Sequence, residues 1–197
     1  MENKLIYEFS SHKTDGEASL SNLLGSKGAN LAEMSKLGIE VPPGFTITTE
    51  VCNYFSHNNH LPDGLKEEIV NCVRNLESYS NKNFGEGKSP LLLSVRSGGM
   101  ISMPGMMDSI LNIGVNDENV GHLAETFSDE RFALDSYRRL IQMYSNVVLG
   151  VEHKRFEAVI ANKKRMDDVV SDADFNVDQL NWIINAYKNT VERFTGS

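Results

Sequence analysis

The first 115 residues carry short apolar and alternating runs that predict a mixed α/β part. Apolar residues at helical spacing predict one helix that ends at Gly38 and another that Asp63 caps. A shorter helix is expected to begin at Thr48 or Thr49. The predicted strands are residues 5–9, 45–49, 91–96 and 109–114.

From Asn116 onward, every periodic segment predicts a helix. The clearest lies between Asp129 and Gly150, and further helices are expected at 152–165 and 177–194. The pattern therefore predicts an α+β fold, with a small α/β part over 1–115 and a helical subdomain over 116–197. The apolar stripe of the clearest helix consists of Ala133, Tyr137, Leu140, Ile141, Tyr144 and Val148.

Composition narrows the class of protein. The chain has 197 residues, of which 40% are hydrophobic and 23% charged, which is typical of a globular protein. Its net charge of -8 argues against nonspecific nucleic-acid binding, which needs clustered basic residues. No signal-peptide core and no run of 18 apolar residues occurs, so we expect no membrane partner and a cytoplasmic location.

Cys52 and Cys72 stand alone, and we expect two buried, reduced thiols and not a zinc site.

The segment SGGMISMPGMMDS, residues 97–109, directly follows LLLSVR, which we expect to be a buried strand ending in Arg96. A fixed cation followed by Ser-Gly-Gly can form a nest of backbone N–H groups that binds an anion. Ser97, Ser102 and Ser109 add hydroxyl donors, and the methionines are adaptable apolar cover for a ligand. The alternative is a plain connection whose methionines fill the core.

The segment LLGSKGANLAEM, residues 23–34, places Gly25 and Gly28 around Ser26 and Lys27 just before a predicted helix. A helix N-terminus favours a phosphate group, because its first N–H groups lack partners and carry partial positive charge. The spacing is not that of a Walker A loop. The alternative is a surface turn that leads into a helix.

Taken together, three segments closely resemble the amino-terminal region of the pyruvate phosphate dikinases. They are LLGSKGANLAEMSKLGIEVPPGFTITTE, LLLSVRSGGMISMPGMMDSILNIGVND and RFALDSYRRLIQMYSNVVLGV. The resemblance runs in register over nearly the whole chain and is strongest over 23–50, 91–117 and 131–151. Related phosphoenolpyruvate synthases share the glycine–lysine segment, whereas MPGMMD looks like the dikinase version. The resemblance implies the first part of an ATP-grasp nucleotide-binding domain.

The resemblance also implies a reaction. The family transfers the β-phosphoryl group of ATP to a histidine on a swivelling domain, and orthophosphate takes the γ-phosphoryl group. The phosphohistidine then converts pyruvate to phosphoenolpyruvate, so the products are AMP, diphosphate and phosphoenolpyruvate. The cofactors implied are ATP and Mg²⁺, with the acidic magnesium ligands expected outside this chain. A homodimer formed through another domain is implied as well.

By motif match, Lys27, Arg96 and Arg139 look like the family's cations on the ATP phosphates. Three cations suit phosphoryl transfer, because negative charge is held and redistributed with little covalent help from the protein. Two residues depart from the family pattern: Ser26 stands where glycine is usual, and Met100 where a basic residue is common. The expected catalytic residues are Arg96 and Arg139, and the expected ATP-binding residues are Lys27, Gly28, Arg96, Ser97, Gly98, Met103, Gly105 and Arg139.

Other candidate residues receive a structural interpretation. His57 and His60 are expected in a solvated turn and not in a metal site. None of His12, His122 and His153 has the sequence context of a phosphohistidine. Tyr137 and Tyr144 are expected in the core and not stacked on a nucleotide. Arg138 and Arg139 face different sides of their helix, and without the resemblance either would be expected to form only solvated ion pairs.

The sequence stops before the second half of an ATP-grasp fold, so we expect a fragment of a dikinase that is inactive alone. One alternative is a fragment of a phosphoenolpyruvate synthase-like enzyme that uses water as phosphoryl acceptor. Another, from a different class, is a free-standing nucleotide-binding or interaction module without catalytic activity. Orthophosphate dependence would separate the two enzymes.

Overall fold

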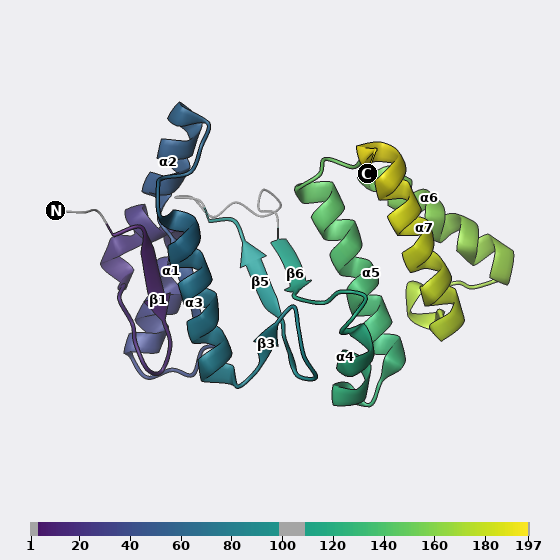
Figure 1. Ribbon diagram of the computed structural model, residues 1–197, viewed down its shortest axis with the longest axis horizontal. Helices are drawn as coiled ribbons and strands as arrows, with labels where there is room; N and C mark the ends of the chain where they lie inside the picture. Colours follow the sequence, from purple (N-terminus) through teal and green to yellow (C-terminus); the bar gives the residue numbers. More distant parts are fainter. Residues whose placement is uncertain (1–3, 99–108, 197) are drawn as a thin grey trace. The chain divides into compact units, whose positions relative to one another are not determined.

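The computed structural model describes residues 4–98 and 109–196, and the chain forms two compact units (Figure 1). The first unit consists of the described residues of Met1–Asn81 and Ser97–Met107, and the second of Lys82–Arg96 and the described residues of Asp108–Ser197. Both units contain helices and strands. The mixed α/β character expected from the hydrophobic pattern is therefore confirmed.

The first unit packs three helices around a two-stranded antiparallel sheet. In the sheet, Ile6 lies opposite Ile47 and Phe9 opposite Gly44. The core is small, with Ile6, Val51, Leu65 and Cys72 at its centre. The elements in chain order are β1 (Ile6–Phe9), η1 (Ala18–Leu20), α1 (Ser21–Lys36), β2 (Gly44–Ile47), α2 (Thr49–Asn58) and α3 (Leu65–Ser80).

The second unit is built around α5 (Glu130–Val147), which packs against α4, α7 and β6 (Figure 1). Asp129 caps α5, because its carboxylate accepts a hydrogen bond of 2.8 Å from the backbone N–H of Phe132. Ala133, Phe156, Leu180 and Tyr187 are among the fully buried residues of its core. The remaining elements are β3 (Asn83–Phe84), β4 (Pro90–Leu91), β5 (Leu93–Arg96), β6 (Ser109–Ile113), α4 (Val120–Phe127), α6 (His153–Asp167), η2 (Asp172–Asp174) and α7 (Val177–Thr195).

Most predicted elements are present close to their expected bounds, and no described residue after Val115 takes part in a strand or bridge. The compact units nevertheless differ from the expected ranges, because β3 to β6 belong to the same unit as the helices that follow them. The assignment of 1–115 to a nucleotide-binding α/β part and of 116–197 to a helical subdomain stays a prediction.

The expected buried strand 91–96 is corrected in two ways. It is divided into β4, which pairs in parallel with β3, and β5, which pairs antiparallel with β6. A register shift lies between Leu93 and Val95, and Val95 is 55% exposed. The described sheet of β5 and β6 has two strands, and α5 packs against β6.

Two further expectations about helices were wrong. Asp63 does not cap α3, because Gly64 takes the N-cap position with φ 77° and the helix has no side-chain cap. The apolar stripe of α5 is buried only in its first part: Ala133, Tyr137 and Leu140 are buried, whereas Tyr144 is 45% and Val148 52% exposed. No described element covers that end of the stripe.

Candidate functional site

The glycine–lysine segment forms a sharp turn inside α1. Gly25 has φ 69° and ψ 160°, which interrupts the helical conformation and divides α1 into two pieces. Positive φ is a conformation that glycine adopts at little cost. Ser26, the departure from the family pattern, is not among the residues with positive φ, so a side chain is tolerated there as expected.

Lys27 lies in the first turn of the helical piece that Gly25 begins, and is half-buried. No ion pair or hydrogen bond joins its ammonium group to another described residue. The first N–H groups of a helix lack intrahelical acceptors, so an unpaired lysine beside them gives a local positive potential. The sequence predicted this lysine just before the helix, and the structure places it just inside.

Gly28 has a packing role that the sequence did not indicate. It is buried in α1, and a Cβ atom built on it would lie 2.7 Å from both Cγ2 and Oγ1 of Thr46 on β2. Real Cβ atoms do not approach other atoms so closely. The absence of a side chain therefore lets the start of the helix lie directly against the strand.

The segment that follows Arg96 approaches the same turn. Arg96 ends β5 opposite Ser109 of β6, and its side chain is exposed. Ser97 and Gly98 are also exposed, and a Cβ atom on Gly98 would lie 4.0 Å from the carbonyl oxygen of Leu24. The two glycine-containing segments singled out in the sequence are thus neighbours at Leu24 and Gly98.

Most of the methionine-rich segment lies outside the residues that the structure describes. Met100, Ser102, Met103 and Gly105 lie outside the described residues. Their expected contribution to ATP binding stays a prediction.

Arg138 and Arg139, which follow each other on α5, have opposite environments. The side chain of Arg138 is 5% exposed and that of Arg139 is 60% exposed. Asp135, one turn earlier, contacts both: its Oδ1 accepts from Nε and Nη2 of Arg138 at 2.9 and 2.8 Å, and its Oδ2 lies 2.8 Å from Nε of Arg139. Only Arg139 therefore presents its guanidinium group to solvent.

Burial and hydrogen bonding act in opposite directions on the pKa values of Arg138 and Tyr187. Burial alone would lower the pKa of Arg138, but its hydrogen bond to Asp135 raises that pKa above its ordinary value. Burial raises the pKa of Tyr187 on α7 to about 12, against the opposing influence of Arg138. Gln142 connects the two, since its Oε1 accepts from Tyr187 Oη at 3.2 Å and from Arg138 Nη1 at 3.4 Å.

The three predicted phosphate-binding cations belong to different units. Lys27 lies in the first unit, whereas Arg96 and Arg139 lie in the second. Their convergence on one ligand stays a prediction.

The cysteine and histidine expectations are partly confirmed. Cys72 is buried, and burial raises the pKa of its thiol to about 11, but Cys52 is exposed and not buried as expected. Cys52 lies on α2, whose single buried residue is Val51. His57 and His60 are exposed and bond to the backbone oxygens of Asn53 and Leu61. His57 lies in the last turn of α2 and not in a turn as expected, whereas His60 follows the helix.

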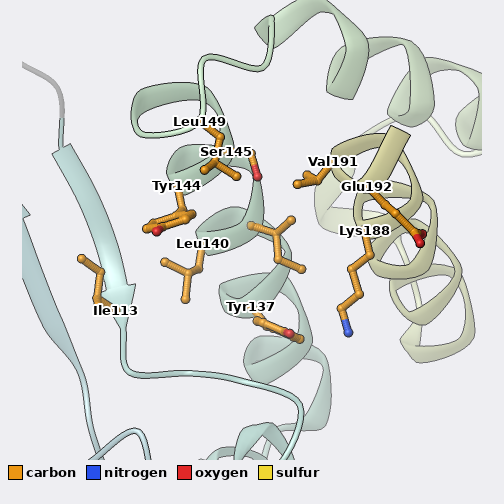
Figure 2. A pocket seen from close by; sticks show the side chains of 10 residues that line it. Ile113, Tyr137, Leu140, Tyr144, Ser145, Leu149, Lys188, Val191 and Glu192 are labelled. Atoms are coloured by element: carbon orange, nitrogen blue, oxygen red, sulfur yellow. The ribbon is translucent and has the colours of Figure 1, made fainter. Parts of the chain in front are cut away.

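The second unit also contains an apolar groove of about 570 Å³ that sequence reasoning missed (Figure 2). It lies over α5 between Ile113 of β6 and Val191 of α7, and Tyr137, Leu140 and Tyr144 line its floor. Lys188 lies at its edge, where its ammonium group pairs with Asp117 and lies 5.2 Å from the centre of the Tyr137 ring. None of the predicted phosphate-binding residues lines this groove. The sequence signal closest to this groove is the apolar stripe of α5, which continues past Leu140 to Tyr144.

Among residues 4–98 and 109–196, no group of three or more His, Cys, Asp or Glu side chains could hold a metal ion. The part of the chain that the structure describes also contains no helix long and apolar enough to cross a membrane.

Comparison with protein families matches residues 21–83 to "Pyruvate phosphate dikinase, AMP/ATP-binding domain". This range begins with α1 and includes the Gly25 turn and Lys27. The match therefore covers the first of the two segments singled out from the sequence.

Individual relatives match a much longer part of the chain. Pyruvate, phosphate dikinase of Rickettsia conorii is 48% identical over 193 residues, which are 98% of this chain and 22% of that protein. The enzyme of Rhizobium meliloti is 44% identical over 98% of this chain and 22% of its own length. The chloroplastic enzyme of Mesembryanthemum crystallinum is 46% identical over 94% of this chain and 20% of its own length. The chain thus spans about a fifth of the length of these relatives. Along nearly its whole length, the chain is therefore similar to the amino-terminal region of the pyruvate, phosphate dikinases.

Proposed function

We propose that this chain carries part of the ATP-binding site of a pyruvate, phosphate dikinase, within a nucleotide-binding domain of the ATP-grasp type. The observation that carries the proposal is the Gly25 turn. This turn sets Lys27, which pairs with no described residue, at a helix start inside the range that matches an AMP/ATP-binding domain. Leu24, directly before the turn, lies close to Gly98. Backbone N–H groups, a lysine and adjacent glycines are what a phosphate chain requires.

In this proposal, Lys27 and the helix start hold phosphate oxygens of ATP, and Gly28 keeps the turn close to β2. Arg96, Ser97, Gly98, Met103, Gly105 and Arg139 complete the phosphate contacts. An arginine offers a planar fork of donors and a lysine a movable point charge, so the two types suit different phosphate groups. Arg96 and Arg139 stabilise the charge that shifts during phosphoryl transfer.

The whole enzyme would convert ATP, pyruvate and phosphate to AMP, phosphoenolpyruvate and diphosphate through a phosphohistidine in another domain. Among the described residues, no group of three or more His, Cys, Asp or Glu side chains could hold a metal ion. The family resemblance implies that the acidic ligands of Mg²⁺ lie outside this chain, and we include this in the proposal. A cytoplasmic location and a homodimer formed through another domain complete the proposal.

The proposal is tested by adding MgATP to the purified chain and following its backbone amides by NMR. We expect shifts centred on residues 25–28 and 98, with millimolar affinity, because each charge pair exposed to water contributes only about 1 kcal/mol at about 4 Å. At about 1 mM ATP the fold would gain roughly 0.4 kcal/mol, and the melting temperature would rise by less than about 2 °C. The chain alone should release neither AMP nor diphosphate.

The matched variants are Lys27→Ala and Lys66→Ala. Lys66 is an exposed lysine of α3, and no described residue pairs with it. We expect the first substitution to weaken MgATP binding by about fivefold and the second to leave it unchanged. Micromolar affinity, equal effects of the two substitutions, or shifts that avoid residues 25–28 would refute the proposal.

A further inference from the structure

One carboxylate on α5 bridges a buried and an exposed arginine. The two oxygens of Asp135 are divided between the neighbours: Oδ1 contacts Arg138 and Oδ2 contacts Arg139. The Asp135 side chain is 15% exposed, between the 5% of Arg138 and the 60% of Arg139. The three side chains thus form a line from the protein interior to its surface.

The buried end of this line is held by several contacts. Arg138 donates from Nε and Nη2 to Asp135 and from Nη1 to Gln142. Its Nη2 also lies 3.8 Å from Oδ2 of Asp172, in η2. A buried guanidinium group needs a polar partner, and Arg138 holds the Asp135 carboxylate through two hydrogen bonds. The position of Asp135 Oδ2 is therefore set by the contacts with Arg138 and does not depend on Arg139.

The exposed end is held at one point only. Arg139 contacts Asp135 through Nε, and the structure gives its two Nη groups no partner among the described residues. An isolated surface pair at this spacing is weak, partly because two mobile side chains must be ordered. Here one partner is already fixed, so ordering Arg139 costs less. The two Nη groups can then donate together to one oxyanion.

We propose that Asp135 is a positioning residue, which holds Arg139 through Nε and thereby presents both Nη groups to a phosphate group of ATP. This inference rests on the proposed function, because it assumes that Arg139 contacts ATP. For removal of the Asp135 carboxylate, the proposal predicts the opposite of what charge alone would give. Removal of a nearby negative charge should favour ATP, whereas loss of the tether should weaken ATP binding.

The test measures MgATP affinity by NMR for the wild-type chain, Asp135→Asn, Arg139→Gln and the double variant. We expect Asp135→Asn and Arg139→Gln each to weaken binding by up to about fivefold, with no further loss in the double variant. Asp172→Asn is the matched control, since Asp172 also faces Arg138 but does not contact Arg139. It should leave the affinity unchanged.

A second measurement, on the wild-type chain, tests the proposal even if Asp135→Asn does not fold. In the wild-type chain, the Nε–H proton of Arg139, assigned with Arg139→Lys, should exchange slowly with water and should shift when MgATP is added. Fast exchange of this proton would overturn the proposal. So would tighter or unchanged binding by folded Asp135→Asn, or a further loss in the double variant.

Failure of the inference and failure of the proposed function give different results. If Arg139→Gln binds MgATP as well as the wild type while Lys27→Ala binds it less well, the role of Asp135 is overturned and the ATP site at Gly25 stands. If MgATP shifts no amide of the wild-type chain, the proposed function and this inference both fail.

Discussion

Replacement of Gly28 by alanine would measure how tightly the predicted phosphate turn is packed. The new Cβ atom would lie 2.7 Å from two side-chain atoms of Thr46 and 3.2 Å from its Cβ. Rotation of Thr46 about χ1 offers little relief, because two of its three staggered positions carry heavy atoms and the nearby Cβ does not move. The helix start or β2 must therefore shift, which costs roughly 1–3 kcal/mol.

An opposing contribution comes from helix propensity. Gly28 does not have positive φ, so alanine fits its backbone and favours the helix by up to about 1 kcal/mol. The net loss of unfolding free energy is then about 0–3 kcal/mol. Gly121 in the first turn of α4 is the matched control, because a Cβ atom there would meet nothing within 4 Å. Gly121→Ala should therefore gain the stabilisation from helix propensity without a steric cost.

Thermal melts of Gly28→Ala and Gly121→Ala should therefore differ by about 1–3 kcal/mol, with Gly28→Ala the less stable. This corresponds to melting temperatures roughly 2–12 °C apart for a chain of this size. Thr46→Ser removes Cγ2 and should restore part of the stability of Gly28→Ala. Equal stabilisation by both alanines would refute the close contact between α1 and β2.

Two further predictions concern Arg96 and the cysteines. In a full-length dikinase that carries this amino-terminal sequence, Arg96→Ala should lower the rate at which ATP phosphorylates the enzyme by roughly 10³-fold and leave the pyruvate half-reaction nearly unchanged. Arg165→Ala, the control, should affect neither half-reaction. Equal losses in both half-reactions would mean that Arg96 is structural. In the native chain at about pH 8, a thiol reagent should modify Cys52 and not Cys72, because burial raises the pKa of Cys72 to about 11 and keeps it a neutral thiol. Rapid modification of both thiols without denaturant would contradict the burial of Cys72.

The outline of the candidate site could be predicted from the sequence because it depends on local signals. Gly25 and Lys27 are two residues apart, so a turn and a helix start bring them together whatever surrounds them. Arg96 at a strand end and Arg139 on a capped helix were found in the same way, by periodicity and by family motif. The proximity of Gly98 to Leu24 could not be predicted, because it joins residues more than seventy positions apart.

The sequence alone determined the kinds of element, most of their bounds and the family, because hydrophobic periodicity, turn residues and motifs are properties of neighbouring positions. Only the tertiary structure decided which faces are covered. It buried Arg138 and exposed Arg139, exposed Cys52 and the end of the α5 stripe, and gave Gly28 a packing role. The burial of a residue depends on segments that are distant in the sequence and pack against it in the fold. A pattern of apolar residues indicates which face of a helix or strand is suited to burial, but it does not identify the segment that covers that face.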